Sequence, residues 1–512
     1  MANVSASADD FRKHFEDLIS KAGIDIPTGG NVWAQYIQFE LEEYEDLKDS
    51  QEDSDDSLAD ELQQAKMKII KLYHRHLSVP LLNNKKVLSD FEKWLEENCV
   101  ESDVGLIDPV ALNRKFTMAE EMLTERLPFE THIMSDEYAA GTVESKTKTW
   151  LGYIKRELAD NNMSRVKRLF ERGVATEHCS TSIQLWQEYI DFARHKVKDW
   201  HLVETATSQC RELFVGNIAY WKTRLASIEC SSKDDQLMNE SVAYATTHGG
   251  LTEVTDYLYV YQYHCDYYKR KLSSLVQDID EDVVISDLNV LKMMVEYITA
   301  FRLHYDTLES FIKTYYNLWE EGWLLITKYR VHIEDNLIEN IIATHLNTDS
   351  SNVGGIGKDL AVTDSSAIFN QLLKLFPKSY YVFTEYIHWS IYTAHNDDIT
   401  RRLYKKAVNV ISEYNMEVAK QWVAWEKALC GDCTFDKVME AETKYFSLLD
   451  THKKKMVLAS SVQDGTGMTQ QKSTSSSRAN ENRRTKNESA SSQRSDDKNG
   501  SRTKKRDWTT AS

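Results

Sequence analysis

The sequence predicts an all-α protein, a solenoid of stacked helical hairpins followed by a disordered C-terminal tail. Three observations predict this fold class. An aromatic-led pattern recurs along the chain with the periodicity of an α-helix. Glycine and proline, which break helices, account for only 18 and 5 of the 512 residues, well below average usage. A chain of this length is also too long for one compact core, whereas each repeat of a solenoid contacts only its neighbours.

The aromatic pattern is Trp-x-x-Tyr-Ile-x-x-Glu, and it occurs in full at Trp33 and at Trp150. Residues at i, i+3 and i+4 lie on one face of a helix, so each copy predicts a helix that packs aromatic side chains against a neighbour. Trp186 follows Trp150 by 36 residues, and Trp221 follows Trp186 by 35, a period that fits one helical hairpin. Weaker versions of the pattern begin at Trp186, Trp221, Phe383 and Trp422.

The second helix of the hairpin is clearest in residues 167–174, Lys-Arg-Leu-Phe-Glu-Arg-Gly-Val, which recur in phase at 401–408 as Arg-Arg-Leu-Tyr-Lys-Lys-Ala-Val. Gly173 and Ala407 occupy the same place in the two copies, where a small side chain lets helices approach closely. We therefore expect these side chains to pack the repeats together: Trp33, Tyr36, Trp150, Tyr153, Glu157, Phe170, Gly173, Trp186, Tyr189, Trp221, Tyr404 and Ala407.

Two glutamates follow the full aromatic patterns. Glu40 and Glu157 each stand seven residues after their tryptophan, on the face that the pattern buries. An unpaired buried carboxylate is costly, so we expect each to have a basic partner on the following helix. For Glu157 the candidates are Arg165, Lys167 and Arg168, and the sequence does not separate them. A structural role is favoured over general acid catalysis, because no second catalytic group recurs with these glutamates.

The elements before the clear repeats are also helical. Residues 11–47 predict a first helical pair, and the apolar spacing in 62–97 predicts a second pair with its turn at Pro80. Twelve acidic residues lie between Glu40 and Glu61. Such a block of like charge is typical of a solvated loop, and the alternative is a docking strip for a basic partner.

Beyond these elements we expect two halves and a tail. The N-terminal half comprises residues 1–280, with its best repeats in 150–271, and the C-terminal half comprises 281–455. A loop of about twenty residues, 347–366, interrupts the second half and is expected to be an insertion. Residues 456–512 are expected to be a disordered basic tail, because they contain too few apolar residues to fold.

Charge separates the body from the tail. Residues 460–512 contain eleven Lys/Arg and six Asp/Glu, so the net charge of −18 implies −23 for residues 1–459. An acidic body is a poor surface for nucleic acid. Two basic clusters in the tail resemble a bipartite nuclear-localisation signal, and the residues that compose them are Arg483, Arg484, Lys486, Arg502, Lys504, Lys505 and Arg506.

No motif predicts catalysis, a cofactor or a metal site. The Gly354–Lys358 segment lacks the spacing of a phosphate-binding loop, and Cys430 with Cys433 supplies at most two of the four ligands of a structural zinc. The seven cysteines are scattered, as is usual in a reducing compartment. No apolar run is long enough to span a membrane, and the N-terminus does not resemble a signal peptide.

The motifs resemble those of a known family. A Trp-x-x-Tyr helix followed by a Leu-Phe-Glu-Arg-Gly helix resembles the half-a-TPR (HAT) repeat of RNA-processing proteins. From about residue 60 to 450 the order of local sequences is similar to that in the HAT domain of U4/U6 snRNP recycling factors. The segments that carry this resemblance are Val79–Asn83, Asp90–Trp94, Arg168–Arg172, Gly250–Tyr257 and Tyr261–Tyr267.

This resemblance implies a right-handed α-solenoid of HAT (TPR-like) hairpins that acts as a nuclear scaffold, not an enzyme. The implied process is pre-mRNA splicing through U4/U6 snRNP assembly or recycling by protein–protein contacts. The alternative is a scaffold of another complex, for mRNA 3′-end cleavage or pre-rRNA processing. The implied partners are snRNP and other spliceosomal proteins, with no membrane partner.

The resemblance also implies a homodimer formed through the C-terminal HAT half. The candidate dimer or partner surface comprises Tyr381, Tyr386, Trp389, Trp422 and Trp425. The RNA-recognition motifs of that family are not found in these 512 residues. RNA association is therefore expected to be mostly indirect, with weak direct binding through the tail.

Overall fold

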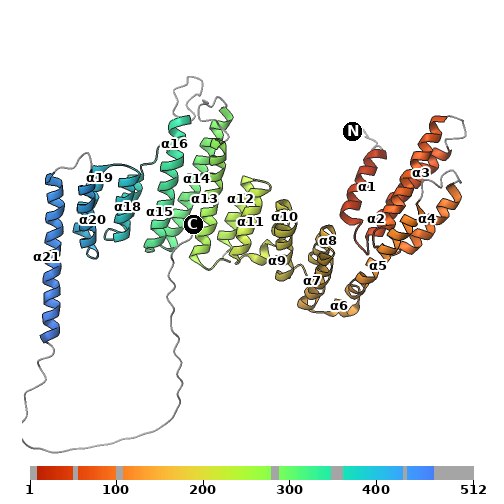
Figure 1. Cartoon of the computed structure of the whole chain (residues 1–512), viewed down its shortest axis with the longest axis horizontal. Helices are drawn as coiled ribbons and strands as arrows, with labels where there is room; N and C mark the ends of the chain where they lie inside the picture. Colours follow the sequence, from red (N-terminus) through yellow and green to blue (C-terminus); the bar gives the residue numbers. More distant parts are fainter. Residues whose placement is uncertain are drawn as a thin grey trace, which may run out of the picture. The chain divides into compact units, whose positions relative to one another are not determined.

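The computed structural model describes residues 8–49, 56–99, 108–248, 250–277, 288–346, 360, 362–429 and 435–465. In these residues the chain is all-α, without a β-strand, as predicted (Figure 1). The helices follow one another as antiparallel hairpins, and successive helices pack side by side, so the predicted α-solenoid is confirmed. No helix in the described part of the chain is both long and apolar enough to cross a membrane.

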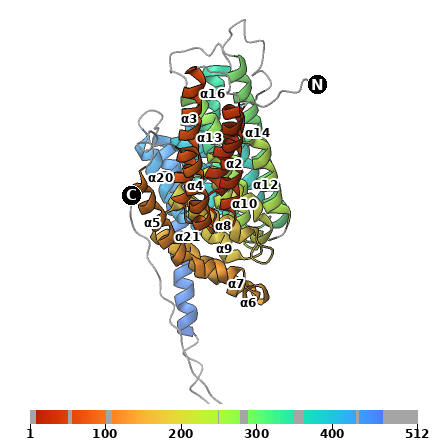
Figure 2. The same cartoon turned by 90° about the vertical axis from the view of Figure 1, so that its right-hand side faces the viewer.

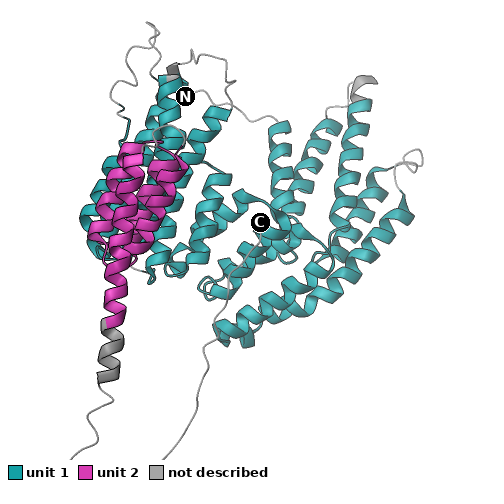
Figure 3. Cartoon of the chain, turned by 60° about the vertical axis from the view of Figure 1, so that its left-hand side comes forward, with its two compact units in different colours: residues 1–376 teal, residues 377–512 magenta. Residues whose placement is uncertain are grey.

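The chain forms two compact units, residues 1–376 and 377–512 (Figure 3). The boundary therefore follows Phe376, whereas we expected the two halves to meet near residue 280. The segment 278–287 lies outside the described residues. The helices on either side of it, α13 (Val254–Gln277) and α14 (Leu288–Tyr315), pack closely against each other, so they belong to one unit.

Unit 1 begins with a five-helix module. Its core is made of large side chains such as Trp33, Ile69 and Phe91, which come from different helices and are almost completely buried. The expected helical pairs are both present, and the turn at Pro80 separates the third helix from the fourth. The helices are α1 (Ala8–Ala22), α2 (Gly29–Asp49), α3 (Asp56–Leu77), α4 (Asn84–Asn98) and α5 (Pro109–Ile133).

The repeats with the clearest period follow. Side-chain caps set where their helices begin, because Thr142, Asn162 and Ser182 each accept a hydrogen bond from a backbone N–H of the first turn that follows. The elements are α6 (Asp136–Ala140), α7 (Val143–Ala159), α8 (Met163–Ala175), α9 (Ile183–Asp191), the π-helix η3 (Phe192–Val197), α10 (Trp200–Gln209), the 3₁₀-helix η4 (Arg211–Phe214), α11 (Ile218–Cys230) and α12 (Asp235–Thr247).

The last part of unit 1 contains the 28-residue helix α14. Helices α11, α12, α13 and α14 pack side by side in sequence order (Figures 1 and 2). They are followed by α15 (Glu320–Ile333), the π-helix η5 (Glu334–Ile338), α16 (Glu339–Ile341), the π-helix η6 (Ile342–Leu346) and α17 (Ser365–Leu375). The expected insertion at 347–366 lies mostly outside the described residues, and its last two residues begin α17.

Unit 2 contains α18 (Tyr380–Tyr392), α19 (Asp397–Val410), α20 (Asn415–Ala428) and α21 (Phe435–Gly465). Helix α21 continues past the other helices of its unit (Figure 3). It includes residues 456–465, which we expected to belong to the disordered tail. This stretch contains the helix formers Met456, Leu458 and Ala459, and the helix ends at the next glycine, Gly465. Residues 466–512 lie outside the described part of the chain.

Candidate functional site

The side chains expected to pack the repeats all lie inside the protein. Each of the twelve is buried, and Trp150, Tyr153 and Trp221 are among the largest fully buried side chains. Gly173 shows why a small residue is needed. A Cβ atom at this position would lie 3.3 Å from the Trp150 ring and 3.2 Å from Leu185, which is tighter than an ordinary contact. Helices α7, α8 and α9 therefore approach each other closely at Gly173.

The partner of Glu157 differs from our expectation. Glu157 is 1% exposed, and the guanidinium of Arg126 on α5 donates to both of its carboxylate oxygens, with Nη2 3.1 Å from Oε2. The partner thus comes from the preceding helix, not from Arg165, Lys167 or Arg168 on the following one. In a solenoid each helix has neighbours on two sides, and the aromatic pattern does not indicate which side supplies the cation.

The same arrangement occurs at Glu40. Arg12 on α1 donates to this carboxylate through Nε (2.7 Å to Oε1) and Nη2 (3.2 Å to Oε2). The expectation of a partner on the following helix is therefore wrong here too. The interaction with Glu40 raises the pKa of the Arg12 guanidinium above its ordinary value.

A second carboxylate follows each of these arginines. Glu16 stands four residues after Arg12 and accepts hydrogen bonds from Nη1 and Nη2 of Arg75, at 2.7 and 2.8 Å. Glu130 stands four residues after Arg126 and accepts hydrogen bonds from Nη1 and Nη2 of Arg172, each at 2.8 Å. Helix α7 contributes as well, because the Tyr153 hydroxyl on this helix donates to Glu130 at 2.9 Å.

Aromatic rings repeat with the charges. Phe15 stacks on Tyr36 with a centroid distance of 4.9 Å and an interplanar angle of 8°, and Phe129 stacks on Tyr153 at 4.9 Å and 7°. Arg75 lies 5.3 Å above the Trp33 ring, and Arg172 lies 5.3 Å above the Trp150 ring. The helix triplets α1–α2–α3 and α5–α7–α8 therefore share one packing unit, which we call the Arg–Glu module.

The sequence signal for this module is Arg-x-x-Phe-Glu, at residues 12–16 and 126–130, which our sequence reasoning missed. A reduced form, Arg-x-x-Tyr, stands at residues 302–305 and 401–404. Arg302 donates to Glu334 through Nε (3.0 Å) and Nη2 (2.7 Å), and the Arg401 Nε donates to Glu426 at 2.9 Å. At these four positions, an arginine followed three residues later by an aromatic residue pairs with a buried glutamate later in the chain.

Ion pairs of Asp25 with Arg168 and Arg172 join the two Arg–Glu modules of unit 1. Asp25, in the loop between α1 and α2, is almost completely buried and lies 3.1 Å from the Arg172 Nη1. Arg172 therefore contacts Glu130, the Trp150 ring and Asp25 at once. This contact ties the N-terminal helical module to α8.

The expected dimer surface in unit 2 is partly wrong. Tyr386 and Trp422 are buried, since they occupy the positions of α18 and α20 that face the neighbouring helices. Trp425 is half-buried and packs on Tyr404, while Trp389 is half-buried beside Tyr386. Only Tyr381, which is 63% exposed, faces solvent broadly. Other exposed apolar side chains of unit 2 that we did not predict are Tyr392, Tyr414, Phe435, Met439, Phe446, Met456 and Val457 among the described residues.

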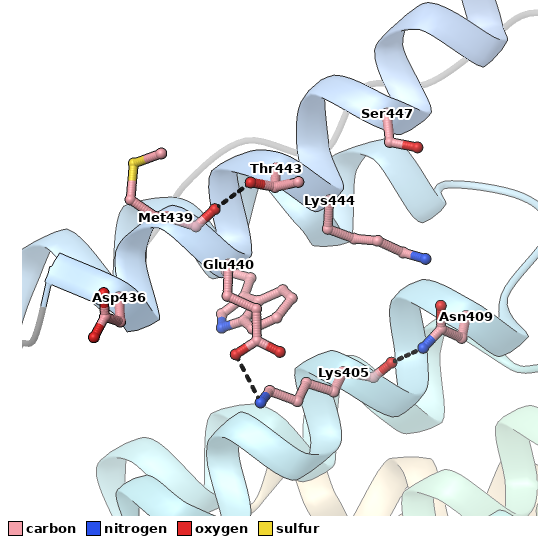
Figure 4. A pocket seen from close by; sticks show the side chains of 9 residues that line it. Lys405, Asn409, Asp436, Met439, Glu440, Thr443, Lys444 and Ser447 are labelled. Carbon is pink, nitrogen blue, oxygen red and sulfur yellow. Dashed lines mark hydrogen bonds and ion pairs between the residues drawn. The ribbon is translucent and has the colours of Figure 1, made fainter.

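A groove lies between α19 and α21 (Figure 4). It encloses about 560 Å³, and the ion pair between Lys405 and Glu440, at 2.8 Å, spans it. Trp422, which lines the groove, is buried beneath these polar side chains. A partner side chain that enters this groove has to displace or bridge the Lys405–Glu440 pair.

Two groups of sequence candidates lie outside the described residues. The first is the candidate nuclear signal, and the second is the Cys430–Cys433 pair together with the Gly354–Lys358 segment. Within the described part of the chain, no group of three or more His, Cys, Asp or Glu side chains is arranged to hold a metal ion.

The fold defines an all-α protein built from repeated helical hairpins. Residues 137–228, which include Trp150, Trp186 and Trp221, match the family model described as Suppressor of forked protein (Suf), a HAT-repeat family. This match covers α7 to α11, where the sequence period is clearest. The predicted resemblance to HAT-repeat proteins is confirmed for this part of the chain.

The chain is also similar to particular proteins. It is 22% identical over 255 residues to the spliceosome associated factor 3, U4/U6 recycling protein, of Danio rerio. The aligned region covers 50% of this chain and 25% of that protein. It is 23% identical over 261 residues to the protein of the same name in Homo sapiens, which covers 51% of this chain and 24% of that protein. The match spans about a quarter of the length of these relatives. The predicted resemblance to U4/U6 recycling factors is confirmed.

Proposed function

We propose that this protein is a nuclear HAT-repeat scaffold of RNA processing that supports U4/U6 snRNP assembly or recycling in pre-mRNA splicing. The observation that carries the proposal is the similarity of half the chain to the U4/U6 recycling proteins. The proposed role is to hold partner proteins, not to catalyse a reaction.

The packing of the repeats supports this role. The buried charges described above are paired within the chain, and each pair joins two helices, so they fix how the helices stack. Residues 1–459 have a net charge of −23, which opposes binding of a polyanion. We infer that snRNA associates with this chain mainly through proteins that the solenoid holds.

Two experiments test the proposal. Affinity purification from nuclear extract should recover U4/U6-specific and Lsm proteins, and recovery of cleavage factors instead would support the alternative. A gel-shift series should compare the full chain with residues 1–459. The full chain should bind RNA weakly, and the slope of log K against log salt concentration should be roughly −3 to −4. Tight and selective binding of U6 RNA by the tail-less chain at physiological salt would contradict the scaffold role.

The alternative function is a scaffold for another RNA-processing complex, such as mRNA 3′-end cleavage or pre-rRNA processing. The observation in its favour is that residues 137–228 match the Suppressor of forked model. The purification described above separates the two functions, because they require different partner proteins.

We also propose that the C-terminal part of the chain mediates self-association. Unit 2 presents exposed apolar side chains on α18 and α21, among them Tyr381, Phe446 and Met456. Residues of this kind are enriched in protein interfaces. The groove between α19 and α21 (Figure 4) offers a recess beside them.

A further inference from the structure

We propose that one edge of unit 1 is a docking surface for a lysine- and arginine-rich peptide segment of a partner protein. The edge, which we call the aromatic edge, is formed by the connections α10–α11, α12–α13 and α14–α15. The inference rests on the proposed scaffold function only in assuming a protein partner, and it applies whichever RNA-processing complex that partner belongs to.

The first two connections touch each other. Gly216 stands before α11 and Gly250 before α13, and a Cβ atom on Gly216 would lie only 2.5 Å from the Gly250 carbonyl oxygen. Side chains at these positions would separate the two loops, so glycine allows their backbones to meet. Helices in a solenoid alternate in direction, so every second connection falls on the same edge.

Phe311 links the third connection to this edge. Its ring on α14 lies 5.1 Å from Tyr257 and 5.2 Å from Tyr261, both on α13, and 5.3 Å from Tyr315. The chain of rings continues through Tyr316 to Trp319 at the start of α15. The aromatic edge therefore presents six rings in mutual contact.

The outer part of this cluster faces solvent. Tyr315 is 70% exposed and Leu318 is 89% exposed, while the remaining rings are half-buried. Tyrosine and tryptophan rings held by neighbouring rings are common at interface centres, because rigid aromatic groups bury a large area at a small cost in side-chain entropy.

Charge indicates the kind of partner. The three connections, residues 210–217, 250–256 and 316–321, contain five carboxylates and one lysine or arginine. The five are Glu212, Glu253, Asp256, Glu320 and Glu321. Residues 1–376 as a whole contain 63 Asp/Glu and 39 Lys/Arg. A cationic segment is therefore attracted to this edge, and nucleic acid is repelled.

The edge already contains one example of the contact we propose. Arg211, the single cation of these connections, lies 3.9 Å from the centroid of the Tyr244 ring. The His248 ring also stacks on Tyr244, with a centroid distance of 3.8 Å. A lysine or arginine of the partner has the same option at Tyr315 and Tyr316, where it gains a cation–π contact while nearby carboxylates pair with its charge.

The test uses the full chain and a fluorescent peptide of about twelve residues in which Lys-Arg pairs alternate with leucine. The edge variant combines Tyr315→Ala with Leu318→Ala, and the matched control is Tyr392→Ala, an exposed tyrosine of unit 2. Anisotropy at low salt should show peptide binding that the edge variant weakens roughly tenfold, and the control should bind as the wild type does. Unfolding curves of all three proteins should coincide, since the replaced side chains are exposed.

A second variant tests the charge. Replacing Glu253 and Glu321 with glutamine should weaken binding several-fold and reduce its dependence on salt. Equal loss in the edge variant and the control would overturn the proposal, as would preferred binding of an acidic peptide or of single-stranded RNA. If residues 1–465 bind the peptide and the full chain does not, the chain's own basic segment occupies the edge and the partner assignment is wrong. Recovery of U4/U6 proteins by an edge variant would leave the proposed function intact, so the two proposals can fail separately.

Discussion

Arg126 on α5 and Glu157 on α7 form a buried, two-pronged ion pair that fixes how these two helices stack. Arg126 also donates to the Met122 carbonyl oxygen within its own helix and to Asp160. The guanidinium is thus satisfied from three directions. Burial of such a pair gives orientation more reliably than it gives stability.

Replacing Arg126 with methionine should lower the free energy of unfolding by about 3–5 kcal/mol, because the buried Glu157 carboxylate loses both hydrogen bonds from its cationic partner. The control is Arg156→Met, which removes an arginine that also pairs with Asp160 but is partly exposed, and its effect on stability should be much smaller. Urea unfolding followed by circular dichroism measures both changes. The double variant Arg126→Met with Glu157→Leu should recover most of the loss. Equal destabilisation by Arg126→Met and by the control Arg156→Met would contradict the finding.

Trp150→Ala should destabilise the protein by about 3–5 kcal/mol, because it removes a fully buried ring from between α7 and α8. Tyr381→Ala, on an exposed ring of unit 2, should change stability by less than about 0.5 kcal/mol. The measurement is again urea unfolding. Unchanged stability of the Trp150 variant together with lost partner binding would show that the ring belongs to a binding face.

Stability should fall as the pH is lowered from about 6.5 towards 4. Burial lowers the pKa of His264 to about 3 and that of His304 to about 4, and the two rings lie 3.6 Å apart. Asn239 and Tyr268, the groups that face them, are neutral, so no carboxylate offsets this effect. The unfolded chain takes up protons below its ordinary histidine pKa of about 6.5 while the folded chain does not, so protonation favours unfolding.

Thermal unfolding at pH 7.5 and pH 5 checks this prediction. The His304→Asn variant should show a smaller difference between the two pH values than the wild type. His14→Asn is the control, because His14 is exposed, and it should leave the difference unchanged. A wild-type protein equally stable at both pH values would rule out the buried neutral pair.

The chain should self-associate, and Phe446→Glu on α21 should weaken that association by roughly tenfold, because it places a charge among the exposed apolar side chains of unit 2. Met118→Glu, at an exposed apolar position of unit 1, serves as the control. Sedimentation velocity across a concentration series measures the effect. A wild-type chain that stays monomeric at tens of micromolar would refute self-association.

The basic clusters of residues 460–512 should direct nuclear import. A fluorescent reporter fused to this segment should accumulate in the nucleus, and alanine at Arg502, Lys504, Lys505 and Arg506 should return it to the cytoplasm. Alanine at Ser489, Ser491 and Ser492 keeps every charge and should have no effect. If the unmodified fusion stays cytoplasmic, the signal lies elsewhere or is absent.

Local periodicity made the helices predictable. The aromatic side chains at Trp33 and Trp150 occupy the buried faces that their spacing indicated, because a helix fixes which residues share a face. The cations that pair with Glu40 and Glu157 were not found, because a residue one hairpin away can approach from either side. Recognising Arg-x-x-Phe-Glu as a repeated motif would have identified both.

Boundaries were harder to predict for a different reason. The end of α21 and the division between the units depend on which helices pack together, and composition alone does not determine that packing. The same holds for Tyr386 and Trp422, whose aromatic character suggested a partner surface although neighbouring helices cover them.

The Arg–Glu module makes parts of this chain interchangeable. Residues 12–16 and 126–130 each offer a cation, a flat ring and a carboxylate at equivalent points along a helix, and each meets the same set of groups on two later helices. A segment that begins at one such helix and ends before the next can be duplicated or lost while both new junctions remain chemically matched. The length of the solenoid can therefore change in evolution by whole segments of this kind without a new interface at each junction.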